Sequence, residues 1–185
     1  MKKITLLFVA LLCLTNCSKK VTSLKLNDFE SIERIRIGMP IDAAVKLASR
    51  NHVVEKSKTI THESEEAEYE YIVYSDKTKR ETLFTFNGGY DNQNSNKVFR
   101  IVIKNSKYST LEGISVGMGM KDLKEIARIK SADFNFEDGL FILSDKFDGG
   151  YWMDVDMKLF DSYNFEEPKI NTLPESLTIK AIIIF

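Results

Sequence analysis

Two acidic residues, Asp154 and Asp156, are the first candidates for chemistry in this sequence. They stand two positions apart in an alternating segment, so on a β-strand their side chains would point to the same side. Two nearby carboxyl groups can serve as the acid pair of a glycoside hydrolase, or they can bind a cation such as Ca²⁺. The same spacing is also typical of the solvated face of a half-buried strand, which is the simpler interpretation.

Nucleophilic catalysis has weaker support in the sequence. It requires a nucleophile, a base within reach and a group that orients the base. The chain has only two histidines: His52 follows a predicted helix end, and His62 lies in a polar segment. We therefore predict a protein without catalytic residues.

Metal and cofactor motifs also fail their spacing tests. The loop Asp91–Asn96 is rich in oxygen ligands, but counting from Asp91 places Gln93 at position three and Val102 at position twelve, which breaks the EF-hand pattern. The sequence has no Cys/His cluster for zinc and no Walker loop for nucleotides. We expect no metal and no cofactor.

An interaction surface is the remaining candidate site. The alternation puts Trp152 on the polar side of its predicted strand with Asp154 and Asp156, and tryptophan is favoured at protein interfaces. Glu66 and Glu68 belong to an acidic run that could form a negative ridge for a cationic partner, or only a solubilising face. These five residues are our candidate interaction surface.

A short internal repeat indicates how the chain is organised. The segments 35–41 (IRIGMPI) and 114–120 (ISVGMGM) align without a gap at an offset of 79 positions. Gly38 and Gly117 can take positive φ at a strand-to-helix junction, and Pro40 suits a first helical turn. Apolar residues then recur at helical spacing: Ile41, Ala44, Val45 and Ala48 in the first copy, and Met120, Leu123, Ile126 and Ala127 in the second.

Strand patterns follow each predicted helix. They cover residues 69–74, 82–86 and 98–103 in the first half, and 140–143, 151–157 and 177–185 in the second. From Tyr151 to Leu159 the apolar residues alternate with polar ones, which is typical of an antiparallel sheet with one solvated side. The predicted fold class is α+β, with two pseudo-repeated units that each contain a short helix and about three antiparallel strands. The units are 28–108 and 109–185, and together they can form one domain.

The N-terminus has the three zones of a secretory signal. Lys2 and Lys3 precede the apolar run 4–14, which is too short to span a bilayer, and the chain turns polar after Cys17. The segment Leu14-Thr15-Asn16-Cys17 resembles the signals of bacterial lipoproteins. The resemblance implies cleavage of residues 1–16, acylation of Cys17 and anchoring of the mature chain to an envelope membrane. We expect the outer membrane rather than the inner one.

The mature chain that these predictions define has a restricted chemistry. Removing residues 1–16 takes away two of the 26 Lys and Arg residues and none of the 27 acidic ones, which leaves a net charge of about −3. That balance argues against nucleic acid as a partner. Cys13 leaves with the signal, so an acylated Cys17 leaves no free thiol. Residues 17–27 form a polar tether, of which segment 18–27 could reach ~33 Å when fully extended.

The repeat itself carries a second resemblance. It is similar to the helix-plus-sheet unit of small outer-membrane lipoproteins associated with β-barrel assembly, and to the tandem domains of β-lactamase-inhibitor proteins. The matching positions are Ile35, Ile37, Gly38 and Met39, and Ile114, Val116, Gly117 and Met118. This resemblance implies a binding fold without catalysis. We therefore expect a membrane-anchored lipoprotein that binds another envelope protein; the alternatives are a carboxylate-dependent envelope hydrolase and an inhibitor or immunity lipoprotein.

Overall fold

The computed structural model describes residues 22–23, 31–59, 68–78, 81–89, 96–135, 139–159, 163, 165 and 167–185. Its elements, in chain order, are β1 Thr22–Ser23, β2 Ser31–Ile32, β3 Ile35–Arg36, α1 Ile41–Ala48, β4 Val53–Thr59, β5 Glu68–Tyr74, β6 Thr82–Gly88, β7 Val98–Ile103, β8 Tyr108–Ser109, α2 Met120–Ile126, β9 Ile129–Asn135, β10 Gly139–Ser144, β11 Gly149–Asp154, η1 Met157–Leu159, η2 Ile170–Thr172 and β12 Thr178–Ile184.

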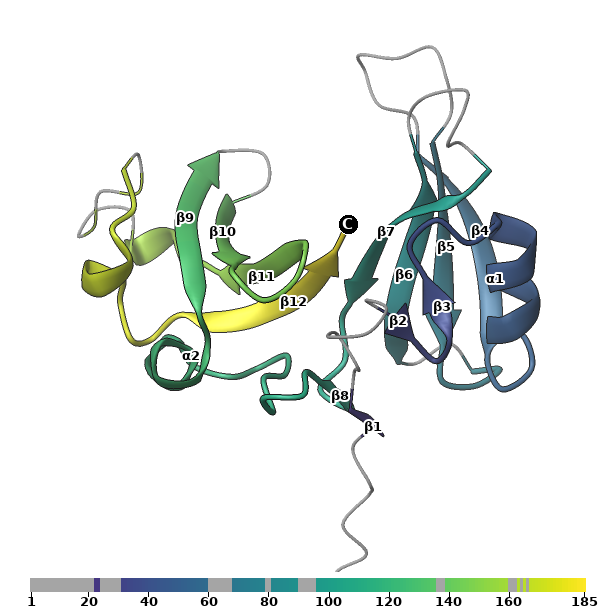
Figure 1. Cartoon of the computed structure of the whole chain (residues 1–185), viewed down its shortest axis with the longest axis horizontal. Helices are drawn as coiled ribbons and strands as arrows, with labels where there is room; N and C mark the ends of the chain where they lie inside the picture. The colour runs from purple at the N-terminus through teal and green to yellow at the C-terminus, as the bar shows by residue number, and fades with distance from the viewer. Residues whose placement is uncertain are drawn as a thin grey trace, which may run out of the picture.

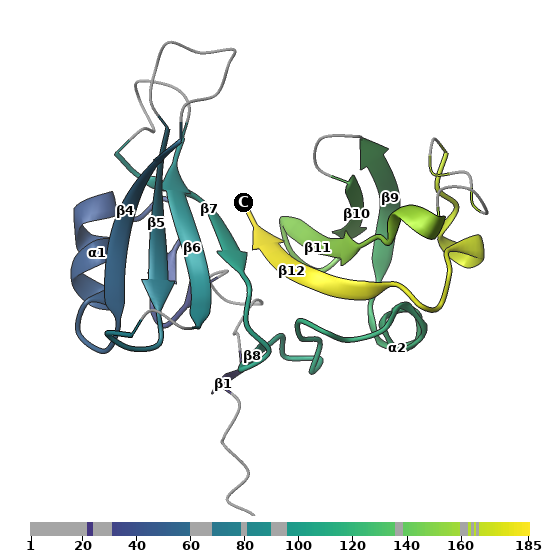
Figure 2. The same cartoon turned by 180° about the vertical axis from the view of Figure 1, so that it is seen from behind.

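One antiparallel sheet organises this part of the chain. Its eight strands lie in the order β4-β5-β6-β7-β12-β11-β10-β9, so that β7 and β12 meet at the centre. The central pairing joins Ile101–Ile103 to Ile182–Ile184. Figures 1 and 2 show the two groups of four strands diverging on either side of this junction, with α1 beside the first group and α2 beside the second. The fold is therefore α+β, as predicted.

The strand predictions were correct in place but incomplete in number. Each of the six predicted segments contains a strand of the sheet. The first strand after each helix, β4 or β9, was not predicted, so that four strands of this sheet rather than about three follow each helix in the described residues. The reason is composition: β4 reads VVEKSKT and β9 reads IKSADFN. Both are the outermost strands of the sheet, where polar residues are tolerated because the strand is only partly covered.

The two Gly-Met motifs begin their helices in similar ways. Gly38 has φ +77° and Gly117 has φ +89°, in the left-handed region that glycine adopts readily. The N–H of Gly38 donates to the carbonyl of Val98 at 2.7 Å, and the N–H of Gly117 donates to the carbonyl of Ile179 at 2.8 Å. Each motif is thereby attached to one of the two central strands, β7 or β12.

The next residues repeat this hydrogen bonding. The N–H groups of Val98 and Ile179 donate back to the carbonyls of Met39 and Met118, at 2.7 and 2.9 Å. Both helices begin one residue later than the breaker, at Ile41 and Met120. The positive-φ glycine therefore turns the chain from a bonded segment at the edge of β7 or β12 into the helix.

The apolar faces of the helices agree with the prediction except at one position. The buried residues of α1 are Ile41, Ala44 and Ala48, and those of α2 are Met120 and Leu123. Ile126 was predicted to lie on the buried face, but it is 42% exposed. The helix ends there, because Ala127 is extended with φ −81° and ψ 140°, and the change of direction turns Ile126 outward. None of the helices in the described residues is both long and apolar enough to cross a bilayer.

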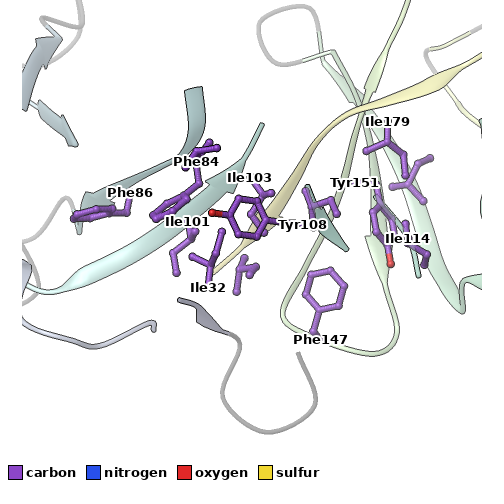
Figure 3. Packing of buried hydrophobic residues seen from close by; sticks show 14 of the residues in the cluster. Ile32, Phe84, Phe86, Ile101, Ile103, Tyr108, Ile114, Phe147, Tyr151 and Ile179 are labelled. Atoms are coloured by element: carbon purple, nitrogen blue, oxygen red, sulfur yellow. The ribbon is translucent and has the colours of Figure 1, made fainter. Parts of the chain in front are cut away.

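One main cluster of buried side chains forms the core, and it draws on both halves of the chain. Figure 3 shows aromatic and branched residues of the first group of strands approaching those of the second, with Tyr108 and Phe147 between them. In β6, Phe84 and Phe86 enter this cluster from the same side of the strand. We call the side of the sheet that bears this cluster the core face and the opposite side the outer face.

The strand from Tyr151 is shorter than predicted. β11 ends at Asp154, and Met157–Leu159 forms a 3₁₀ turn. The alternation itself is present: Tyr151 and Met153 are buried, whereas Asp154 and Asp156 are exposed. The N–H of Lys158 donates to the Asp156 carboxylate at 3.0 Å, which favours the turn over a continued strand.

Part of the predicted tether is paired. β1 runs parallel to β8, with Thr22 opposite Tyr108 and Ser23 opposite Ser109. The polar composition of segment 18–27 gave no sign of this contact because a backbone ladder places little demand on side-chain type. The chain from Cys17 to the first contact is therefore only five residues long.

Burial of Tyr151 leads to a pH prediction. Burial raises the pKa of this phenol to about 12, against a partly opposing hydrogen bond with Ser144. A raised folded-state pKa means that the stabilisation is intact below pH 10 and is lost as the pH rises towards 12. Urea unfolding should show about 2 kcal/mol less stability from this residue at pH 11.5 than at pH 9.5. Tyr151→Phe should lose less stability over that interval than the wild type; an equal loss would contradict the assignment.

Candidate interaction surface

A second, smaller hydrophobic cluster lies on the outer face of the sheet. Val102 in β7 and Ala181 and Ile183 in β12 are buried there. Three partly buried aromatic residues surround them: Phe141, Trp152 and Phe185. We call these six residues the outer patch.

Strand register brings the outer patch together. Trp152 in β11 stands opposite Ala181 in β12 on one side and opposite Phe141 in β10 on the other. Phe141 and Phe185 contact each other edge to face, with ring centroids 6.3 Å apart. The Lys180 ammonium group lies 5.0 Å from the centroid of the Trp152 ring, within the range of a cation–π interaction. The patch is thus aromatic with a cation at its margin.

The outer face next to the patch is polar. In the first group of strands, Lys104 and Glu70 form an ion pair at 3.7 Å, and the Arg100 side chain donates to the Asn87 amide oxygen at 3.3 Å. An apolar centre with a charged surround is the usual anatomy of a protein–protein interface.

Asp154 and Asp156 line an open pocket beside the patch. The pocket has a volume of about 480 Å³, and its other lining residues are Lys158, Leu159, Ser176 and Thr178. The two carboxylates therefore lie on the same side of the chain, as their spacing predicts. Asp156 also accepts the N–H of Lys158, so part of its hydrogen-bonding capacity stabilises the 3₁₀ turn. Among the described residues, no group of three or more His, Cys, Asp and Glu could hold a metal ion.

Some predicted residues cannot be placed. Cys17, His62, Glu66 and residues 91–95 of the polar loop lie outside the described residues. Glu68 is the first residue of β5 and pairs with Thr59 in β4, which puts its backbone at the far end of that strand pair from the helix. Of the five predicted surface residues, Asp154 and Asp156 line one pocket, and Trp152 belongs to the outer patch.

A polar cluster around Glu33 was not predicted from the sequence. The Glu33 carboxylate lies 2.7 Å from Nε2 of His52, and it accepts a 2.6 Å hydrogen bond from the Tyr108 hydroxyl group. Glu33 sits in the two-residue turn between β2 and β3, where it and Arg34 have φ +49° and +73°. His52 follows α1 and Tyr108 begins β8, so one carboxylate joins three separate segments.

Burial makes this cluster structural in character. Tyr108 is 3% exposed, and its burial, followed by the hydrogen bond to Glu33, raises the pKa of the phenol well above its usual range. The other ring nitrogen of His52, Nδ1, is also buried. The Tyr108 phenol stays protonated, and the His52 imidazole faces the Glu33 carboxylate. These contacts hold separate segments of the chain together. No sequence motif predicts the cluster, because His52 and Tyr108 lie 19 and 75 positions after Glu33.

The fold and this surface define an α+β protein with one eight-stranded antiparallel sheet and an aromatic patch on its outer face. The sequence matches no protein-family model and no curated protein. Among solved structures, the chain is similar to the crystal structure of the uncharacterized protein yfeY from Escherichia coli, with a TM-score of 0.60 and 12% sequence identity. The match covers 88% of this chain and 99% of that one. This likeness shows a shared fold.

Proposed function

We propose that this protein is an envelope lipoprotein, anchored through acylated Cys17, whose folded part binds another envelope protein without catalysis. The anchor rests on the N-terminal signal pattern that ends at Cys17. The binding role rests on one observation, the outer patch. Trp152, Phe141 and Phe185 lie together on the outer face of the sheet, and aromatic side chains of this kind carry much of the binding energy at protein interfaces.

We also infer that the fold is a duplicated unit. Helix α1 and strands β4–β7 correspond to helix α2 and strands β9–β12 in order, and the strand order is symmetric about the β7–β12 junction. The matching hydrogen bonds of Gly38 and Gly117 support the same correspondence. A duplicated helix-plus-sheet unit fits the resemblance to tandem inhibitor domains, which implies a binding fold without catalysis.

Capture from detergent-solubilised envelopes tests the binding proposal. The bait is the full chain, and the variant combines Trp152→Ala with Phe141→Ala. Because two central aromatic contacts are removed, recovery of the partner should fall at least tenfold, which corresponds to about 1.4 kcal/mol or more of binding free energy. Quantitative mass spectrometry of the recovered proteins measures the change.

The matched control is Tyr69→Ala, which removes an exposed aromatic residue from another part of the sheet. Tyr69→Ala should leave recovery unchanged. Thermal unfolding of all three proteins checks that the double variant is still folded. Equal recovery with a folded double variant would exclude the outer patch as the binding surface.

A further inference from the structure

The pairing of β1 with β8 limits how the domain can sit on a membrane. If Cys17 is acylated, as proposed above, its Cα is at most ~18 Å from that of Thr22, because five residues span no more than about 3.3–3.6 Å each. Thr22 is held against Tyr108. The anchor therefore restrains one end of the molecule, the end that bears β8, and not the domain as a whole.

Figures 1 and 2 show what else lies at this end. β1, β8, the connection to α2 and α2 itself lie along the lower edge of both views. The starts of β5 and β7 lie at the opposite edge. We call the segment 108–126 the tether end of the molecule.

Exposed apolar side chains occur at both ends. Among the described residues, four large hydrophobic side chains are strongly exposed. Leu111, 48% exposed, lies two residues after β8, and Ile126, 42% exposed, ends α2. Tyr69 and Phe99 are 42% and 40% exposed but lie near the starts of β5 and β7.

From this placement we propose that the tether end rests on the bilayer that holds Cys17, with Leu111 and Ile126 in contact with its interfacial region. Apolar side chains gain by leaving water for that region, and the short tether keeps them within reach. Charge does not drive the contact, since segment 108–126 has two lysines, Lys121 and Lys124, against three acidic residues, Glu112, Asp122 and Glu125. The occupant is therefore the lipid surface itself, without a requirement for anionic headgroups.

Depth-dependent quenching of tryptophan tests this orientation. Trp152 is the single tryptophan, so Trp152→Phe gives a silent background in which Leu111→Trp, Ile126→Trp, Tyr69→Trp and Phe99→Trp are made one at a time. The full chain is purified from membranes and placed in phosphatidylcholine vesicles that carry a nitroxide on the acyl chain. We expect at least twofold stronger quenching at positions 111 and 126 than at 69 and 99, unchanged when anionic lipid is added.

A longer tether provides the matched control. Ten Gly and Ser residues inserted after Lys20 leave the fold intact but remove the short restraint, so the difference between the two pairs of probes should shrink towards zero. Equal quenching at all four positions with the natural tether, or stronger quenching at 69 and 99, would overturn the proposal.

Labelling with a fatty acid separates this proposal from the one on which it rests. Label on the wild type that is lost in Cys17→Ala supports the anchor. Label on the protein together with equal quenching overturns the orientation alone. Absence of label overturns the anchor and the orientation together, and leaves binding through the outer patch to its own test.

Discussion

Replacing Gly150 by alanine should destabilise the protein by about 4 kcal/mol or more. Gly150 lies in β11, between Leu143 of β10 and Ile183 of β12. A Cβ atom at this position would overlap the carbonyl oxygen of Ile142 and would lie 3.0 Å from its carbonyl carbon and 3.1 Å from Cα of Leu143. These are backbone atoms of a paired strand, so they cannot move aside without breaking the ladder.

Gly119→Ala is the matched control for this prediction. The nearest atom to an added Cβ there is the carbonyl oxygen of Glu175 at 3.9 Å, and φ is −75°. This substitution should change the free energy of unfolding by less than about 0.5 kcal/mol. Urea unfolding measures both variants, and soluble yield serves as a second measurement if Gly150→Ala does not fold. Similar stability of the two variants would show that β10 and β11 can separate at Gly150.

Glu33→Ala is expected to cost about 3 kcal/mol. The change removes the acceptor of the Tyr108 hydroxyl group and the partner of His52 Nε2, and each buried polar group left without a partner costs about 1–3 kcal/mol. The substitution should loosen three segments, because the Glu33 carboxylate joins the β2–β3 turn to β8 and to the segment that follows α1. Chemical denaturation with tryptophan fluorescence measures the loss.

Two further substitutions make this test specific. Glu33→Gln keeps one acceptor oxygen and should give a smaller loss than Glu33→Ala. Arg34→Ala changes the neighbouring, exposed residue of the same positive-φ turn and should be close to neutral. If Glu33→Ala and Arg34→Ala have equal effects, the turn rather than the carboxylate would account for the destabilisation.

Local features of the fold were predictable because local physics decides them. The Gly-Met motifs located both helix starts, since a glycine that can take positive φ and a helical run of apolar residues are visible in sequence. Strands with β-branched and aromatic residues were also found, such as β7 and β12. β4 and β9 were not found, because a strand at the edge of a sheet needs few apolar residues. Its composition then resembles that of a loop.

Features that depend on pairing between residues far apart in the sequence could not be predicted. Nothing in the sequence indicates that β7 pairs with β12, or that Phe141 and Phe185 join Trp152 through strand register. The alternation correctly placed Trp152 on the side away from Tyr151 and Met153, but that side carries a hydrophobic cluster as well as the two aspartates. The Glu33 cluster depends on tertiary contacts in the same way.

The central position of β12 has a consequence for how the chain reaches its native state. Strand β7 has β6 as a local partner, but its other neighbour, Ile182–Ile184, lies about 80 positions later, with Ile103 opposite Ile182. Until that segment has emerged, β7 is an unsatisfied edge with an apolar side, and such edges recruit wrong partners. Pairings across so long a span also close slowly. Folding should therefore be late and cooperative, and we expect a nascent chain that ends before β12 to depend on chaperones to stay in solution.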